Sequence, residues 1–269
     1  MDARTVCALL NRIRKQKPLI HNITNIVVAN FSANGLLALG ASPFMASSEN
    51  EAAEAAKMAD ALVLNMGTVD EAILKAMVKA GRSANAHGTP VIFDPVGAGA
   101  TPYRKFVAES LLEELKMTMI RGNAAEISQL IGEQGEVKGV DAGVLKGNPA
   151  EWAKRAAKQW QTVVIATGKD DVISDGSKTF LVHNGHPILT QVTGTGCLLS
   201  AVAGAFAAVE KDPVKAAVSA VTFYGVAAEI AAEKSGKQGP GSFQMEFINQ
   251  LALVSEAEIL RHGSFEQIE

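Results

Sequence analysis

The sequence has 269 residues and a formal net charge of −3; 48% of its residues are hydrophobic and only 5% are aromatic. Lysine and arginine form no run or cluster of the kind that binds nucleic acid, so we expect no nucleic-acid partner. A core that is aliphatic and rich in alanine is typical of helices packed on a sheet of valine, isoleucine and leucine.

Residues 1–16, MDARTVCALLNRIRKQ, are amphipathic and charged, unlike a signal peptide with its apolar centre. No apolar stretch combines the length and the lack of polar interruption that a membrane span needs. The two cysteines, Cys7 and Cys197, are far apart and belong to no CxxC pair, so they predict neither a zinc site nor a disulfide scaffold. We therefore expect a cytoplasmic protein without a membrane partner.

Short apolar runs alternate with helical patterns through the first part of the chain. Continuous apolar runs that end in turn residues are typical of strands buried on both faces of a parallel sheet. Asp70 and Asn123 lie where helix N-caps belong, and Gly88 lies where a helix ends. Repeated β-α units predict right-handed crossovers and a single α/β domain over residues 1–269. The runs are 61–67, 90–96, 117–122 and 162–168; the helical patterns are 49–60, 70–88, 103–116 and 123–132.

The pattern changes after Gly168. Residues 170–185 predict a hairpin that turns at Asp175 and Gly176. Helices are then expected at 194–210, 212–233 and 241–256, with Pro213 in a first turn and a flexible loop at 234–242.

Residues that follow the predicted strands carry the candidate chemistry, because ligands of an open parallel sheet bind beyond the carboxyl ends of its strands. Any one of these residues could instead be an ordinary turn or capping residue. Together they supply a carboxylate, a guanidinium group and several glycines, which suit a phosphate group and a magnesium ion. They are 65–67, 94–97, 121–123 and 167–168.

The motif TGTGC, residues 193–197, opens the first of the late helices. Gly194 and Gly196 allow backbone N–H groups to turn inward, and the positive end of the following helix points at the same place. Together they predict an anion hole. The motif is not a Walker loop, because the sequence has no G-x-x-x-x-G-K-[ST]. It is not a dinucleotide fingerprint either, because Leu199 stands where the third glycine would be. A plain tight turn remains the alternative.

Cys197 lies in the first turn of that helix, where we expect the helix end to lower the thiol pKa from about 8.5. A nucleophilic thiolate would need a base partner, and the sequence does not show whether any of the five histidines lies near it. Alternatively, Cys197 lies where an acceptor alcohol meets a phosphate, as a base or a positioning group. Phosphoryl transfer depends mainly on positioning and charge neutralisation, so a thiol is compatible with it.

The segment RGNAAE, residues 121–126, completes a candidate phosphoryl-transfer site. Arg121 can neutralise phosphate charge, and Glu126 lies one helical turn after Asn123. Glu126 could hold Mg²⁺ through water. The alternative is purely structural: Asn123 caps the helix and Glu126 completes a capping box.

Several of these motifs together resemble the ribokinase-like superfamily and, within it, the hydroxyethylthiazole kinase family. The similarity runs from about residue 5 to the end of the sequence. It implies a three-layer α/β/α fold with a mostly parallel central sheet. It also implies ATP- and Mg²⁺-dependent phosphorylation of the alcohol of 4-methyl-5-(2-hydroxyethyl)thiazole, in thiamine synthesis, by a homotrimer with active sites at subunit boundaries. The motifs are HNITN (21–25), SPFM (42–45), NMGT (65–68), DPVGAGAT (94–101), RGNAAEI (121–127) and TGTGCLLSA (193–201).

The same resemblance assigns the substrate side of the site. It implies that Asn25 and Met45 contact the thiazole and that Gly194 lies beside the hydroxyethyl arm. Most of the superfamily has aspartate at the position of Cys197, where it acts as the base, whereas thiazole kinases have cysteine. We therefore expect Cys197 to occupy the base position and not to form a phosphocysteine. Met45 could equally be ordinary core, and His21 either orients the substrate loop or is a satisfied buried histidine.

On the nucleotide side, the resemblance implies that Arg121 and Thr167 contact the phosphates of ATP, with Gly196 in the anion hole. Asp94 and Glu126 would lie around the magnesium ion.

Related functions remain as alternatives. Hydroxymethylpyrimidine kinases share GTGC and the fold, but HNITN and RGNAAE argue against them. A nucleotide-hydrate dehydratase of the same fold would carry aspartate in place of Cys197. A catalytically dead binding protein would not need the charged positions that are filled here.

Overall fold

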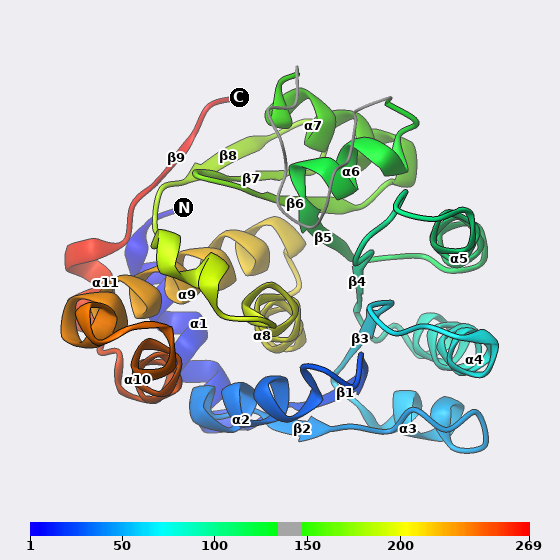
Figure 1. The fold of residues 1–269 in the computed structure, drawn as a ribbon, viewed down its shortest axis with the longest axis horizontal. Coiled ribbons are helices and arrows are strands. Elements are labelled where there is room, and N and C mark those ends of the chain that lie inside the picture. Colours follow the sequence, from blue (N-terminus) through cyan, green and yellow to red (C-terminus); the bar gives the residue numbers. More distant parts are fainter. Residues whose placement is uncertain (134–146) are drawn as a thin grey trace.

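The computed structural model describes residues 1–133 and 147–269. Within these residues one sheet has the strand order β2-β1-β3-β4-β5-β6-β7-β8-β9 (Figure 1). Neighbouring strands from β2 to β6 are parallel, and those from β6 to β9 are antiparallel. The strands are β1 (Leu19–Ile23), β2 (Ser42–Phe44), β3 (Ala61–Asn65), β4 (Val91–Asp94), β5 (Met119–Asn123), β6 (Val163–Thr167), β7 (Asp171–Ser174), β8 (Thr179–Val182) and β9 (Phe265–Gln267).

Helices cover both faces of this sheet (Figure 1). One face carries α1 (Ala3–Gln16), α2 (Ala29–Leu39), α8 (Thr195–Val209), α9 (Pro213–Ser235), α10 (Pro240–Leu253) and α11 (Glu256–His262). The other carries α3 (Ala52–Met58), α4 (Glu71–His87), α5 (Pro102–Glu114), α6 (Ala124–Leu130) and α7 (Pro149–Trp160). Short 3₁₀ helices, η1 (Pro187–Gln191) and η2 (Gly236–Gln238), precede α8 and α10. The architecture is the expected three-layer α/β/α fold.

Side-chain alternation along the central strands creates two cores. Val63 and Ile92 point to the face of α8, whereas Leu64 and Phe93 point to the face of α4 and α5, and all four are buried. This two-sided burial explains why the strand segments read as continuous apolar runs. The same alternation turns Asp94, two residues after Ile92, toward α8.

The predicted elements of the central region are confirmed. The apolar runs form β3 to β6, Asp70 and Asn123 cap α4 and α6, and Gly88 ends α4 in the left-handed conformation. The hairpin is β7 and β8, joined at Asp175 and Gly176. The helix expected at 241–256 is α10, which ends at Leu253; a further helix that was not predicted, α11, begins after Ser255, whose side chain forms a capping box.

One helical segment of the described chain, Pro213–Gln238, is long and apolar enough to cross a membrane by length and composition. The expectation that no stretch of the sequence is long and apolar enough to span a membrane was therefore wrong. However, 89% of its most apolar window is buried inside the fold, where α9 packs against α8, α10 and α1. Its apolar sequence is therefore accounted for by its place in the core.

Candidate active site

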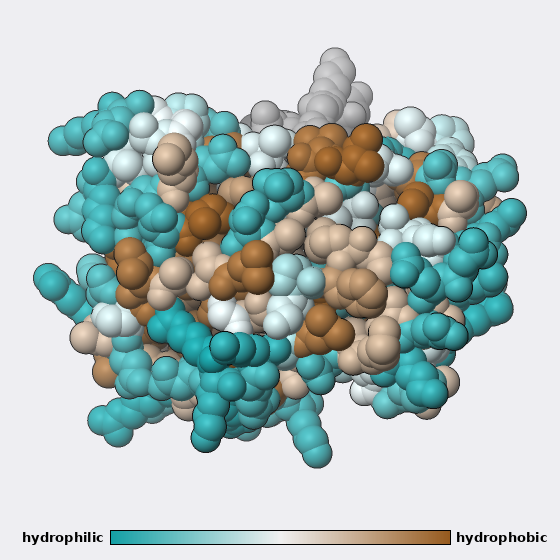
Figure 2. Space-filling view, turned by 90° about the horizontal axis from the view of Figure 1, so that it is seen from below, coloured by the Kyte–Doolittle hydropathy of each residue, from teal (hydrophilic) through white to brown (hydrophobic). Residues whose placement is uncertain are grey.

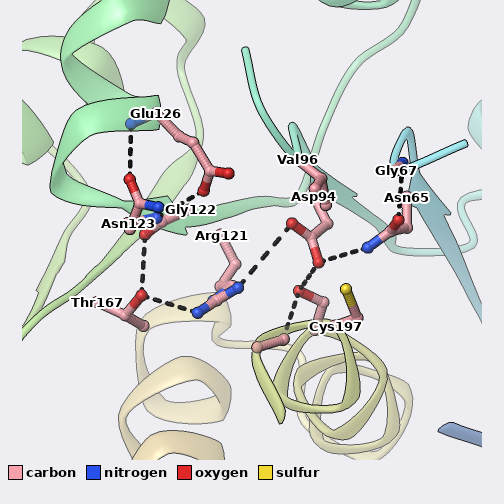
Figure 3. A network of polar contacts seen from close by, with 12 residues as sticks. Asn65, Gly67, Asp94, Val96, Arg121, Gly122, Asn123, Glu126, Thr167 and Cys197 are labelled. Atoms are coloured by element: carbon pink, nitrogen blue, oxygen red, sulfur yellow. Dashed lines mark hydrogen bonds and ion pairs between the residues drawn. The ribbon is translucent and has the colours of Figure 1, made fainter. Parts of the chain in front are cut away.

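Polar side chains meet at the carboxyl edge of the sheet, opposite the first turn of α8, and Figure 3 shows those of β3 to β6. The glycines and the cysteine of the TGTGC motif lie in or beside that first turn. Asn65, Asp94 and Thr167 end their own strands, Asn25 follows β1, and Arg121 lies within β5. Asn25 and Cys197, which are 172 positions apart on the chain, are thereby joined in one polar network, as a shared edge of parallel strands predicts.

Asp94 is the most deeply buried member of this network, with no exposed surface. Its Oδ2 accepts hydrogen bonds from Asn65 Nδ2 at 2.7 Å and from Ser200 Oγ at 2.8 Å. Among the residues that the structure describes, its Oδ1 has no hydrogen-bond partner, and it lies 4.0 Å from Nη1 of Arg121. Burial raises the pKa of Asp94, against the lowering effect of Arg121. One carboxylate oxygen is therefore left free in the site.

Arg121 supplies the positive charge. Its Nη2 donates to Thr167 Oγ1 at 2.8 Å, and Thr167 donates in turn to the Gly122 carbonyl at 3.3 Å. Burial alone would lower the pKa of Arg121, but the carboxylates of Asp94 and Glu126 outweigh it and the pKa is raised. The guanidinium group therefore stays charged, and its Nε has no hydrogen-bond partner within residues 1–133 and 147–269. This arrangement suits binding of phosphate oxygens.

Glu126 has the predicted structural role and a further contact. Its Oε2 accepts from the backbone N–H of Asn123 at 2.8 Å, and Asn123 Oδ1 accepts from the N–H of Glu126 at 2.9 Å, which completes a capping box. Its Oε1 accepts from the N–H of Gly97 at 2.8 Å. Burial and the nearby Asp94 raise the pKa of Glu126. The carboxylate of Glu126 therefore does more than cap α6: through Gly97 it also contacts the loop after β4.

Asp94 and Glu126 are the two carboxylates that could hold a metal ion at this edge of the sheet. In residues 1–133 and 147–269 no three His, Cys, Asp or Glu side chains are grouped to hold a metal ion by themselves. The donor set is two buried carboxylates with raised pKa values, of which Asp94 leaves Oδ1 unpartnered. Two carboxylates fit Mg²⁺, which keeps several waters and takes further ligands from substrate phosphates.

The two glycines before Cys197 are needed for steric reasons. Gly194 has φ +89°, and a Cβ there would also lie 2.7 Å from Val28 Cγ1. A Cβ on Gly196 would lie 2.5 Å from Nη1 of Arg121. The start of α8 can thus lie directly against the guanidinium group, which brings the positive helix end and Arg121 to one place.

The sulfur of Cys197 is half-buried and accepts a hydrogen bond from Asn25 Nδ2 at 3.6 Å. Burial, with a contribution from Asp94, raises the pKa of this thiol to about 11, although Arg121 acts in the opposite direction. The expected lowering of the thiol pKa was wrong, because burial and Asp94 raise it by more than Arg121 and the hydrogen bonds to the sulfur lower it. In the described residues no histidine is hydrogen-bonded to Cys197. Nothing in the site therefore activates a nucleophilic thiolate.

The predicted substrate residues lie on the β1 and β2 side of the site. Asn25 is buried and contacts Cys197. Met45 is half-buried directly after β2, and no polar contact places it in the Asn25–Cys197 group within the described chain. The next residue, Ala46, is held through its carbonyl by Nε2 of His21 at 2.7 Å. His21 is therefore a buried residue that fixes the segment carrying Met45.

Sequence reasoning missed three side chains that shape the site. Ser200, one turn after Gly196 on α8, donates to Asp94; a spacing of four on a helix face was the available signal. Asp171 accepts from the N–H of Gly168 at 2.9 Å, and burial raises its pKa to about 6. Arg104 of α5 donates to carbonyls of the loops after β3 and β4, at 2.6 to 3.0 Å. No motif in the sequence indicated these last two contacts.

The fold recurs in solved structures. A ribokinase-like superfamily protein from Enterococcus faecalis V583 has a TM-score of 0.61 and 12% identity, with 87% of this chain and 86% of that chain covered. A pyridoxal kinase from Staphylococcus aureus, in complex with AMP-PCP and pyridoxal, has a TM-score of 0.56 and 18% identity, with 77% and 86% covered. These similarities show the fold alone, and they define its class: the three-layer α/β/α architecture of the ribokinase-like type.

Closer similarity identifies the family. The hydroxyethylthiazole kinase family model matches residues 10–257. The structure of a hydroxyethylthiazole kinase from Pyrococcus horikoshii OT3 has a TM-score of 0.91 and 42% identity, with 99% of this chain and 100% of that chain covered. The chain belongs to the hydroxyethylthiazole kinase family, as its motifs predicted.

Proposed function

We propose that this protein transfers the γ-phosphoryl group of ATP to the primary alcohol of 4-methyl-5-(2-hydroxyethyl)thiazole, a step of thiamine synthesis or salvage. Family membership and the 42% identical relative support the reaction. The observation that carries it in this chain is the start of α8, which faces Arg121 and Asp94 on one side while Cys197 contacts Asn25 on the other. That placement would bring a phosphate and an alcohol together.

The phosphates of ATP bind between Arg121, Thr167 and Gly196. In phosphoryl transfer the charge of the transition state is spread over the equatorial oxygens, so positioned positive groups supply most of the catalysis. Arg121 and the positive end of α8 are such groups, and their contact through Gly196 fixes their relative position.

Asp94 and Glu126 would hold Mg²⁺, in part through water. The ion would neutralise phosphate charge when bound. Within the chain, Asn65 and Ser200 hold Oδ2 of Asp94, so that Oδ1 stays directed at the site.

Asn25, Met45 and Gly194 bind the thiazole alcohol. Its hydroxyl oxygen forms the new bond to the γ-phosphorus while the bond from that phosphorus to the bridging oxygen of ADP breaks. The hydroxyl proton passes to Cys197, which acts as a base through its minor thiolate form and never bonds to phosphorus. The raised thiol pKa opposes nucleophilic attack but supports a group that takes up a proton once transfer is under way.

The active form is a homotrimer of single-domain, cytoplasmic chains, with active sites at the subunit boundaries. Ile26 and Val27 directly follow Asn25, and they are 85% and 64% exposed. Leu37 of α2 is 60% exposed, and Figure 2 shows apolar side chains across the face that carries α2, β2 and α3. Apolar side chains this exposed beside a substrate residue support burial by a second copy.

Two measurements test these proposals. ADP release with Mg-ATP should require the thiazole alcohol, and mass spectrometry should identify the phosphate monoester as product. Sedimentation velocity should give a trimer for the wild type and smaller species for Ile26→Glu, with Met245→Glu, a substitution at a 73% exposed site on α10, as a matched control. A wild-type monomer with full activity would contradict the subunit-boundary site.

A further inference from the structure

Asn65 lies at the centre of the polar network, between Asn25 and Asp94. It ends β3, is 2% exposed, and bridges Asn25 on one side and Asp94 on the other; Figure 3 shows its bonds to Asp94 and Gly67. Its Oδ1 accepts from Asn25 Nδ2 at 2.9 Å and from the backbone N–H of Gly67 at 3.0 Å. Its Nδ2 donates to Asp94 Oδ2 at 2.7 Å.

These partners fix the orientation of the Asn65 amide. A backbone N–H can only donate, so the group facing Gly67 must be the oxygen; a carboxylate oxygen accepts, so the group facing Asp94 must be the nitrogen. Both lone pairs of Oδ1 are then used, one by Gly67 and one by Asn25. A reversed amide would place a nitrogen against two donors and an oxygen against a carboxylate.

The orientation of Asn65 in turn fixes Asn25. Because Oδ1 of Asn65 is an acceptor, Asn25 must present its Nδ2, which also lies 3.6 Å from Cys197 Sγ. Gly67 keeps Asn25 close, since a Cβ at position 67 would lie 2.7 to 2.8 Å from its side-chain atoms. In the part of the chain that the structure describes, Oδ1 of Asn25 accepts no hydrogen bond. It is a fixed acceptor beside the thiol.

We infer that Asn65 is a positioning residue that sets the specificity of the site: it holds the amide of Asn25 so that Oδ1, which has no partner among the described residues, accepts the hydrogen bond of the substrate hydroxyl. This hydrogen bond belongs to the resting complex, in which the sulfur of Cys197 carries its proton; the hydroxyl proton turns to Cys197 only in the thiolate form that supports transfer. The site therefore selects a hydroxyl group over an apolar group on the same heterocycle. This inference rests on the proposed function and deepens it, since it names the direction of the hydrogen bond between Asn25 and the alcohol.

The test compares binding of two ligands by calorimetry, without ATP: the hydroxyethyl thiazole and its 5-ethyl analogue, which lacks only the hydroxyl. For the wild type we expect the alcohol to bind about five- to tenfold more tightly, the effect of one hydrogen bond. Asn65→Ala should reduce this ratio to near one by weakening the alcohol alone, because Asn25 is then free to turn. Asn65→Asp keeps the acceptor for Asn25 and should keep the ratio, while kcat falls because the donor to Asp94 is lost.

Ser200→Ala is the matched control, since it removes the other donor to Asp94 and leaves Asn25 untouched; the ratio should stay at the wild-type value. If Asn65→Ala does not fold, Asn65→Ser serves, because its hydroxyl is too short to reach Asn25. An unchanged ratio in the Ala or Ser variant overturns the inference, as does an equal loss of affinity for both ligands, which marks a general structural role. A wild type that binds neither ligand refutes the proposed function itself, whereas an active wild type that does not distinguish them refutes only the inference.

Discussion

Replacing Cys197 by aspartate tests whether this position acts as a base. The thiol has a pKa of about 11, so about one molecule in 3,000 carries the thiolate at pH 7.5. An aspartate beside Asp94, with a pKa of about 5, would be almost entirely ionised at that pH. The substitution therefore raises the population of the basic form by about 3,000-fold.

The carboxylate is, however, a weaker base. The pKa difference of about six units costs about 1,000-fold in proton-transfer rate at a Brønsted slope of about 0.5. Gain and loss nearly cancel, so kcat of Cys197→Asp should equal that of the wild type or exceed it by about threefold. Cys197→Ser keeps the size but removes the base, and kcat should fall by about 100-fold or more.

The assay is ADP release at saturating Mg-ATP and thiazole alcohol between pH 6 and pH 10, with melting curves for each variant. Wild-type kcat should rise with pH as the thiolate forms, whereas kcat of Cys197→Asp should be flat above about pH 6. A well-folded Cys197→Asp that loses more than 100-fold, or a Cys197→Ser as active as the wild type, would refute the base role. A phosphocysteine in the intact mass would refute it as well.

Further substitutions test the charges and the close packing around the anion site. Arg121→Ala leaves Asp94 buried without its countercharge, so we expect about 3 kcal/mol less stability in urea titrations and about 1,000-fold lower kcat; an unaltered kcat would contradict the phosphate role. Burial raises the pKa of Asp171 from 3.8 to about 6, so the folded state binds a proton at this carboxyl more tightly than the unfolded state does. The stability that the bound proton contributes is lost as the pH rises through about 6. Asp171→Asn should therefore be about 2 kcal/mol more stable than the wild type at pH 8 and no more stable below pH 4; a gain that does not change with pH would exclude this cause. Gly196→Ala displaces the guanidinium group by its 2.5 Å contact and should raise KM for ATP about tenfold, with KM for the alcohol unchanged; equal effects on both would show a general distortion instead.

The central strands could be predicted because their sequences report two-sided burial directly. Segments such as residues 90–93 are apolar at every position, which is typical of a strand covered on both faces. β1 and β2 gave no such signal. β1 carries His21 and Asn22, whose polar atoms bond to backbone carbonyls inside the fold, and β2 is three residues long and contains a proline. Burial of those polar groups depends on tertiary contacts that a local pattern does not contain.

The residue types of the site were predicted, but their protonation was not. Asp94, Arg121 and Thr167 were expected together because the carboxyl ends of parallel strands share one edge. The pKa of Cys197 was predicted in the wrong direction, because the sequence shows its place on a helix but not its depth of burial. Ser200 could have been found from its helical spacing, whereas Asp171 is brought to the site by the antiparallel turn after β6.

The central claim is the identity of the acceptor, and ADP release with Mg-ATP tests it most directly, with the thiazole alcohol and hydroxymethylpyrimidine compared as substrates. The account predicts turnover with the thiazole alcohol and a kcat/KM at least 100-fold lower with the pyrimidine, since its hydroxymethyl arm is shorter and its ring differs in shape. Turnover with the pyrimidine and none with the thiazole would contradict the assignment while leaving the fold and the phosphate site in place.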